Sequence, residues 1–138
     1  MTINELLSEV DELKPNQYGD EQKIRWINKV EKTIIEEIIK MREPDKKPEE
    51  TEESEESAGN EETEFTGYTE ATNMDTELVV KEPYTDLYKY YLFSMIDMHN
   101  EEYDRYQNSS QMFNAAYQDF ANYWYRTHRG KQPMHWKN

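Results

Sequence analysis

The sequence predicts an all-α fold, a helical bundle of about four helices, two of them long, with one irregular or short-strand arm. Three observations lead to this prediction. Apolar residues recur three and four positions apart over four separate stretches of the chain. Proline, glycine, asparagine and serine stand between these stretches, as is typical of turns. Residues 65–82 lack the helical period, and only residues 76–80 there have the composition of a short strand.

The first predicted helix covers residues 3–14. One apolar stripe recurs along it at helical spacing: Ile3, Leu6, Leu7, Val10 and Leu13. Thr2 and Glu5 stand three positions apart, as in a capping box, where each side chain accepts a hydrogen bond from the other residue's backbone N–H. Pro15 disfavours helical geometry in the residue before it, so we expect the helix to end there.

The second predicted helix covers residues 21–42. Asp20 is a favourable N-cap, and Glu21 places a negative charge in the first turn, where the helix dipole favours it. The apolar stripe consists of Ile24, Ile27, Val30, Ile34, Ile38 and Met41, widened by Ile35 and Ile39. We therefore expect residues 1–42 to form the N-terminal helices of a single domain.

An acidic segment, residues 43–64, separates these helices from the rest of the chain. It holds eleven acidic residues and two lysines, a net charge of −9, whereas the whole chain of 138 residues carries −14. The segment has no large apolar side chain, so it cannot bury enough surface to offset the entropy that ordering would cost. We interpret it as a flexible linker. The alternative is an acidic tract that repels DNA or recruits a basic partner.

Residues 65–129 are expected to complete the same domain with the arm and two long helices. The first of these is predicted over residues 84–107, with Pro83 in its first turn. Its first half is apolar on almost every side, through Tyr84, Leu87, Tyr88, Tyr90, Tyr91, Leu92, Phe93, Met95, Ile96 and Met98. A helix that is apolar all round is normally buried all round. We therefore expect one side to meet the chain's own core and another to meet a second subunit.

The last predicted helix covers residues 110–128, after a break at Asn108 or Ser109. Its single apolar stripe consists of Met112, Phe113, Ala116, Tyr117, Phe120, Tyr123 and Trp124. Gly130 is expected to end it. Residues 130–138 form a basic C-terminal tail, for which docking to a partner and a frayed terminus both remain open.

The sequence carries no recognisable catalytic pattern. There are no cysteines, the four glycines do not form a phosphate-binding loop, and the three histidines do not fall in a metal-ligand motif. His99 lies on an apolar stripe and is expected to be a hydrogen-bonded core or interface residue. Asp97, Glu101 and Asp104 recur at helical spacing, so a divalent-cation site is the alternative to a solvated acidic face. We predict that the protein is not an enzyme and uses no cofactor or metal.

Composition excludes further classes of protein. No apolar run approaches the roughly 20 residues of a membrane-spanning helix, so we expect no membrane partner. No N-terminal segment has the pattern of a secretion signal. Acidic residues outnumber basic ones by 30 to 16, which does not support binding to the DNA backbone through a basic patch.

Five groups of residues together carry a family resemblance: Lys23 to Trp26, Met74 to Leu78, Pro83-Tyr84, Asn100 to Tyr106, and Arg126 to His128. The stretches that contain them, residues 11–38 and 65–129, resemble the small head–tail connector (adaptor) proteins of long-tailed phages that infect Gram-positive hosts. The length and acidity of residues 43–64 depart from the usual pattern of these proteins.

The resemblance implies a structural protein of the virion, located at the head–tail interface and present in the host cytoplasm during assembly. It implies a twelve-fold homo-oligomeric ring that binds the portal protein and joins the DNA-filled head to a stopper or tail-completion protein. DNA would pass through such a ring without specific binding.

If the protein forms a ring that binds the portal, we expect two sets of contact residues. The residues expected near a subunit contact are Tyr84, Leu87, Tyr91 and Met98. The residues expected to dock on the portal are Arg126, His128, Arg129 and Trp136. The alternative of a different class is a small acidic inhibitor that mimics DNA and blocks a host DNA-binding enzyme, for which net charge is the only support.

Overall fold

The computed structural model describes residues 1–42, 65–69 and 71–128. Its body consists of four α-helices: α1 (Ile3–Leu13), α2 (Asp20–Ile34), α5 (Asp86–His99) and α6 (Tyr103–Thr127). The rod of α2 continues through a π-helical turn, Ile35–Ile39, and a 3-10 turn, Lys40–Arg42. The predicted all-α fold is confirmed. The acidic segment predicted as a linker and the basic tail, residues 130–138, lie outside the described residues.

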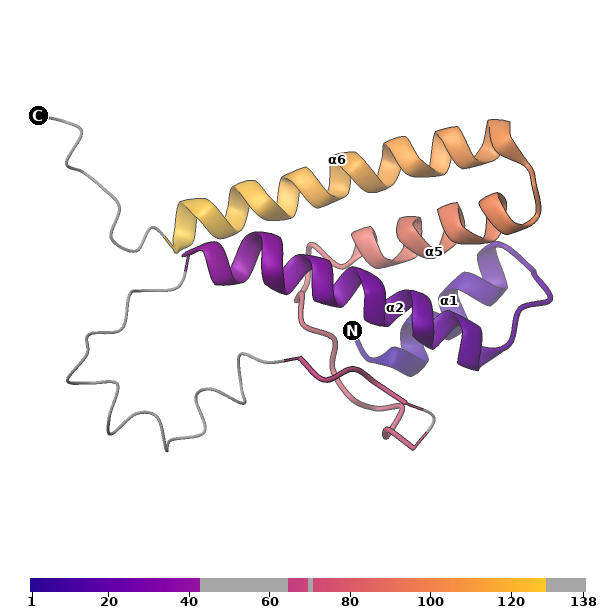
Figure 1. The fold of residues 1–138 in the computed structure, drawn as a ribbon, viewed down its shortest axis with the longest axis horizontal. Helices are drawn as coiled ribbons and strands as arrows, with labels where there is room; N and C mark the ends of the chain where they lie inside the picture. The colour runs from indigo at the N-terminus through magenta and orange to yellow at the C-terminus, as the bar shows by residue number, and fades with distance from the viewer. Residues whose placement is uncertain (43–64, 70, 129–138) are drawn as a thin grey trace, which may run out of the picture.

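α5 is the central helix of the fold. It packs against α6 as an antiparallel hairpin and also contacts α1 and α2 (Figure 1). The far end of the α2 rod, in its π-helical turn, meets the C-terminal part of α6. One continuous core results, and its fully enclosed apolar side chains include Ile3, Leu6, Ile27, Ile34, Ile38, Leu78, Leu87 and Leu92.

The N-terminal helices follow the sequence prediction closely. The Thr2 Oγ1 accepts a hydrogen bond from the Glu5 N–H at 3.1 Å, and the Glu5 carboxylate accepts one from the Thr2 N–H at 3.0 Å, which completes the capping box. α2 begins one residue earlier than expected, because Gly19 occupies the N-cap and Asp20 lies inside the first turn. Asp20 therefore acts there through its charge on the helix dipole, without a side-chain cap.

The long helix predicted over residues 84–107 is wrong in its extent, since α5 ends at His99. Glu101 adopts a φ of 61°, in the left-handed region. Its N–H donates to the Met98 carbonyl at 3.0 Å, and the Glu102 N–H donates to the Asp97 carbonyl at 2.9 Å. This pair of bonds is the Schellman arrangement that ends a helix. Because a glutamate stands where glycine is usual, this helix end could not be predicted from the sequence.

The fourth helix accordingly begins at Tyr103 rather than near residue 110, so no break occurs at Asn108 or Ser109. Ser109 is instead a buried residue inside α6 whose hydroxyl donates to the Asp97 carboxylate at 2.7 Å. The sequence predicted a long third helix and a shorter fourth one, whereas the structure has a 14-residue α5 and a 25-residue α6.

The arm, residues 65–85, forms no strand among its described residues, and the short-strand expectation for residues 76–80 is not confirmed. The arm instead makes one isolated antiparallel bridge between Thr2 and Glu77. The Leu78 N–H donates to the Met1 carbonyl at 2.9 Å, and the Ile3 N–H donates to the Thr76 carbonyl at 3.1 Å. Since α1 begins at Ile3, the paired segment is too short to become a strand.

Candidate functional site

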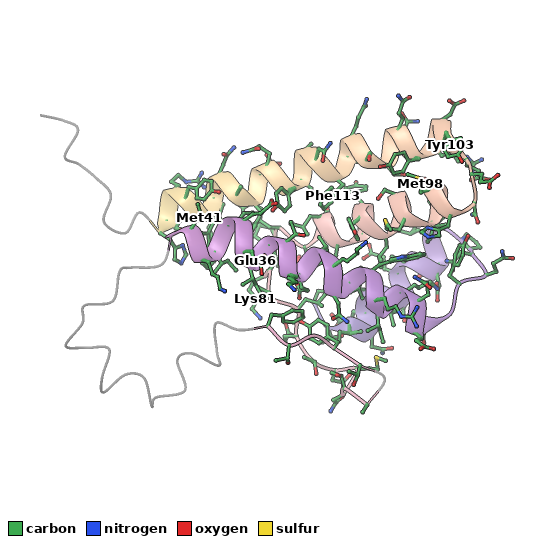
Figure 2. The ribbon with its side chains drawn as sticks, viewed as in Figure 1. Glu36, Met41, Lys81, Met98, Tyr103 and Phe113 are labelled. Atoms are coloured by element: carbon green, nitrogen blue, oxygen red, sulfur yellow. The ribbon has the colours of Figure 1, made fainter. Side chains whose placement is uncertain are left out.

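The outer side of the α5–α6 hairpin carries the apolar surface that a partner could cover. We name its hollow the α5–α6 groove, which has a volume of about 220 Å³. The residues that line it are Pro83, Tyr84, Asp86, Tyr90, Met112, Ala115, Ala116 and Asp119. Met112 is 49% exposed there, and Met98 (37%) and Tyr103 (59%) are exposed at the turn between the helices (Figure 2).

The four residues expected near a subunit contact divide between surface and core. Tyr84 is half-buried, lines the groove and stacks on Tyr123 with ring centroids 4.6 Å apart. Tyr91 is half-buried against Phe113 at 5.2 Å, and burial raises the pKa of its hydroxyl. Met98 keeps more than a third of its surface exposed.

Leu87 requires a correction, because it is fully buried in its own chain at 0% exposure. It lies on the side of α5 that packs into the core, so it presents no surface to a neighbour. A single copy therefore encloses one side of α5 by itself, with Tyr88, Leu92 and Ile96 also buried. Tyr91, Phe93 and Met95 of the same helix are partly buried against this core. The Tyr91 ring lies against Phe113 of α6, and the Lys14 Nζ lies 5.2 Å from the centroid of the Phe93 ring.

The residues expected to dock on the portal begin at the C-terminal end of α6. Arg126 is exposed, and its guanidinium lies 6.0 Å from the centroid of the Tyr123 ring. His128 is exposed and stacks flat on Trp124, with ring centroids 3.6 Å apart and an interplanar angle of 6°. Arg129 and Trp136 lie outside the described residues.

The three carboxylates considered as a cation site do not come together. Their shared face required one helix through residue 104, whereas α5 ends at His99. Asp97 is fully buried and accepts hydrogen bonds from the Lys14 Nζ at 3.0 Å and from the Ser109 hydroxyl at 2.7 Å, while Glu101 and Asp104 are exposed. In the described part of the chain, no group of three or more His, Asp or Glu side chains is placed to hold a metal ion.

His99 is an exposed, hydrogen-bonded residue at the end of α5. Its Nδ1 lies 2.9 Å from the Met95 carbonyl oxygen. Its ring lies 5.2 Å from that of Trp26 and 6.1 Å from that of Tyr18. The Tyr18 hydroxyl also bonds the Asn100 side chain at 2.6 Å, so these contacts fasten the α1–α2 loop to the hairpin turn.

A buried carboxylate that the sequence analysis missed lies at the centre of the fold. Glu31 of α2 is 0% exposed and accepts hydrogen bonds from the Tyr88 hydroxyl at 2.6 Å and the Tyr68 hydroxyl at 2.8 Å. It also accepts one from the Val79 N–H at 3.0 Å. Burial raises the pKa of Glu31, although these hydrogen bonds oppose the shift, and the pKa values of Tyr68 and Tyr88 rise as well through burial and the nearby carboxylate.

Glu31 connects three elements through one side chain. Its partners come from α5 and from two points of the arm, and the Tyr88 hydroxyl also accepts a hydrogen bond from the Val80 N–H at 2.8 Å. A signal was present in the sequence, because Glu31 stands four residues after Ile27 and three before Ile34 on the apolar stripe of α2. A carboxylate at a core position of the repeat indicates a buried polar site.

A second hollow lies between α2 and the arm, with a volume of about 500 Å³. The residues that line it are Glu21, Ile24, Arg25, Asn28, Tyr68, Thr69 and Ala71. The Asn28 amide exchanges two hydrogen bonds with the backbone of Tyr68, at 2.7 and 2.9 Å. Arg25 and Glu21 already pair with each other at 3.3 Å. None of the described lining residues is a histidine or cysteine.

Comparisons with protein-family models, with curated proteins and with solved structures find no match for this chain. Within the ranges that the structure describes, no helix is both long enough and apolar enough to cross a bilayer.

Proposed function

We propose that the protein is a structural virion component that assembles as a homo-oligomeric ring, binds the portal protein, and connects the DNA-filled head to the stopper or tail. The observation that carries this proposal is the apolar surface of the α5–α6 hairpin. Met98, Tyr103 and Met112 remain 37–59% exposed on one helical hairpin. Exposed apolar surface that gathers on one element is typical of a protein–protein contact.

The residues that carry the family resemblance also support a structural role. Trp26 is buried beside Tyr18 and His99. Residues 100–106 form the turn of the hairpin and the start of α6, and residues 74–78 pair with the N-terminus. Such positions build a scaffold, as expected for a protein that works by assembly.

The proposed ring has a heterologous contact, in which one face of a subunit meets a different face of the next and closure leaves no unpaired face. After the correction for Leu87, the hairpin contributes Tyr84, Tyr91 and Met98 to that contact. Arg126 and His128, at the exposed end of α6, are proposed to meet the portal.

The test is the mass of the purified protein, alone and mixed with the portal protein of its phage, measured by light scattering and electron microscopy. We expect a ring in at least one condition. Met98→Asp and Met112→Asp introduce a charge at exposed positions and should weaken the ring at least tenfold, because they place a desolvated charge in the contact.

Thr33→Asp is the matched control, since Thr33 is exposed on α2, away from the hairpin. It should leave assembly unchanged. A protein that stays monomeric in both conditions overturns the proposal. A ring that tolerates both methionine variants places the contact on a surface other than the hairpin.

A further inference from the structure

The α5–α6 groove combines aromatic walls with carboxylates from both helices. Tyr84 and Tyr90 line it on the α5 side, and Met112 lines it on the α6 side. Asp86 and Asp119 stand in the same lining, one before and one after the hairpin turn. Aromatic faces and carboxylates both attract cations, and a Lys or Arg side chain can lay its apolar stem on such walls. The groove therefore suits a basic side chain.

One lysine of the same hairpin already follows this chemistry. The Lys89 Nζ lies 3.8 Å from the Asp86 carboxylate and 5.0 Å from the centroid of the Tyr90 ring, although it is also 3.8 Å from Glu9. Asp119 makes no ion pair with a basic side chain of the described residues. The α6 side of the groove thus keeps a carboxylate open to a further cation.

A basic segment of suitable length follows α6 directly. Residues 129–138 include Arg129, Lys131 and Lys137, together with Trp136, and contain no acidic residue. Asp119 precedes the end of α6 by about eight residues, or roughly 12 Å at 1.5 Å per residue. Ten extended residues span up to about 33 Å, so the segment is long enough to reverse direction and reach the groove.

We propose that residues 129–138 fold back along α6 and bind the α5–α6 groove of their own chain, with a lysine at Asp119 and Trp136 on the aromatic and methionine wall. Gly130 supplies the backbone freedom for the reversal. A groove of about 220 Å³ offers few contacts, so binding between separate molecules would be weak. A short connection within one chain raises the effective concentration to about the millimolar range, which favours the same molecule.

This inference goes beyond the proposed ring and does not depend on it. It has one consequence for assembly, because the tail and a neighbouring subunit would compete for Tyr84 and Met112.

The test uses the absence of cysteine in the chain. A nitroxide attached to Asn138→Cys should reduce the amide NMR signals of Tyr90 and Asp119 by more than half, relative to the reduced, diamagnetic label. The signal of Lys32, which is exposed on α2, should change little. No reduction at the groove, or an equal reduction over the whole surface, overturns the proposal.

A mixed sample separates one chain from two. When spin-labelled chains without ¹⁵N are mixed with ¹⁵N-labelled chains without a nitroxide, the groove signals should keep their intensity. A reduction in this mixture means that the tail binds a second copy, which also overturns the proposal as stated.

A charge reversal tests the role of the carboxylate. Asp119→Lys, at an exposed position, should remove most of the signal reduction at Tyr90, and Lys131→Asp with Lys137→Asp should restore part of it. Glu12→Lys, exposed on α1, is the control and should leave the reduction unchanged. An unchanged reduction in the folded Asp119→Lys protein contradicts the proposed pairing.

Discussion

Replacing Glu31 by alanine removes the acceptor of three donors in the interior at once. The Tyr68 and Tyr88 hydroxyls and the Val79 N–H all point at this carboxylate, at 2.6–3.0 Å. A buried donor left without a partner costs about 1–3 kcal/mol, so the three together cost about 3–9 kcal/mol. Removing the carboxylate also relieves its own desolvation, which offsets several kcal/mol of that cost.

We therefore expect Glu31→Ala to lower the free energy of unfolding by about 3 kcal/mol, a large part of the 5–15 kcal/mol typical of a domain. Glu31→Gln keeps one carbonyl acceptor and an amide that can donate to a tyrosine oxygen, so it should cost only about 1 kcal/mol. Urea denaturation followed by circular dichroism and tryptophan fluorescence measures both variants.

The matched control is Glu36→Ala, since Glu36 is exposed on the continuation of the same helix (Figure 2). It should change the free energy of unfolding by less than about 0.5 kcal/mol. If Glu31→Ala costs no more than this control, the three hydrogen bonds do not hold the arm to α2 and α5, and the reasoning is refuted.

The pH dependence of stability gives the same site a second test. Burial raises the pKa of Glu31 in the folded protein above the value of 4.5 that applies when the chain is unfolded. The folded state therefore binds this proton more tightly, so its contribution to stability is complete below pH 4.5 and is lost as the pH rises through the folded pKa. Wild type should thus lose stability relative to Glu31→Gln as the pH rises through this window. A stability difference between the two proteins that is constant with pH would contradict the burial of this charge.

Three further substitutions test single features of the backbone and the core. Glu101→Gly should raise the free energy of unfolding by about 0.5–1 kcal/mol, because glycine adopts the φ of 61° without steric cost. The control Glu102→Gly, at a φ of −98°, should not stabilise the protein, and thermal melts compare the two variants. Asp97→Ala should lower the free energy of unfolding by about 3 kcal/mol, because it leaves the Lys14 ammonium and the Ser109 hydroxyl without their buried partner. A loss below about 1 kcal/mol in urea denaturation would show that these two interactions do not stabilise the fold. Gly67→Ala should lower the free energy of unfolding by about 1–2 kcal/mol, since Gly67 has a φ of 101°. An unchanged melting temperature would exclude strain at this position.

The elements that the sequence predicted well are those with a strong local pattern. The capping box at Thr2 and Glu5 and the stop before Pro15 depend on neighbouring residues only, and both appear in the structure. The α2 rod has an apolar stripe that repeats over about five turns, so its extent to Arg42 was predicted within one residue at each end.

The hairpin shows where local patterns fail. Tyr103 and Tyr106 continue the apolar stripe of α5 past its end, so the sequence resembles one long helix. The chain turns at Glu101 because the reversal lets α6 cover α5 and brings Ser109 to Asp97. The strain at one residue is small beside the area that this packing buries.

The candidate site was predictable only in part for the same reason. Periodicity identified α5 as unusually apolar, but it could not tell which of its sides faces the core. Leu87 and Met98 both lie on this helix, and only the packing of α1, α2 and α6 around it decides that one is enclosed and the other exposed.

By itself the sequence determined the helical class, the capping box of α1, the α2 rod and the position of the acidic segment, because each depends on residues close together in the chain. Only the tertiary structure decided the turn at Glu101, the burial of Glu31 under two tyrosines, and the groove between Tyr84 and Asp119. The last two join residues far apart in the chain, and the turn at Glu101 is favoured by the packing of α6 on α5. The free energy that fixes all three comes from burial and hydrogen bonds that exist only after the helices have packed.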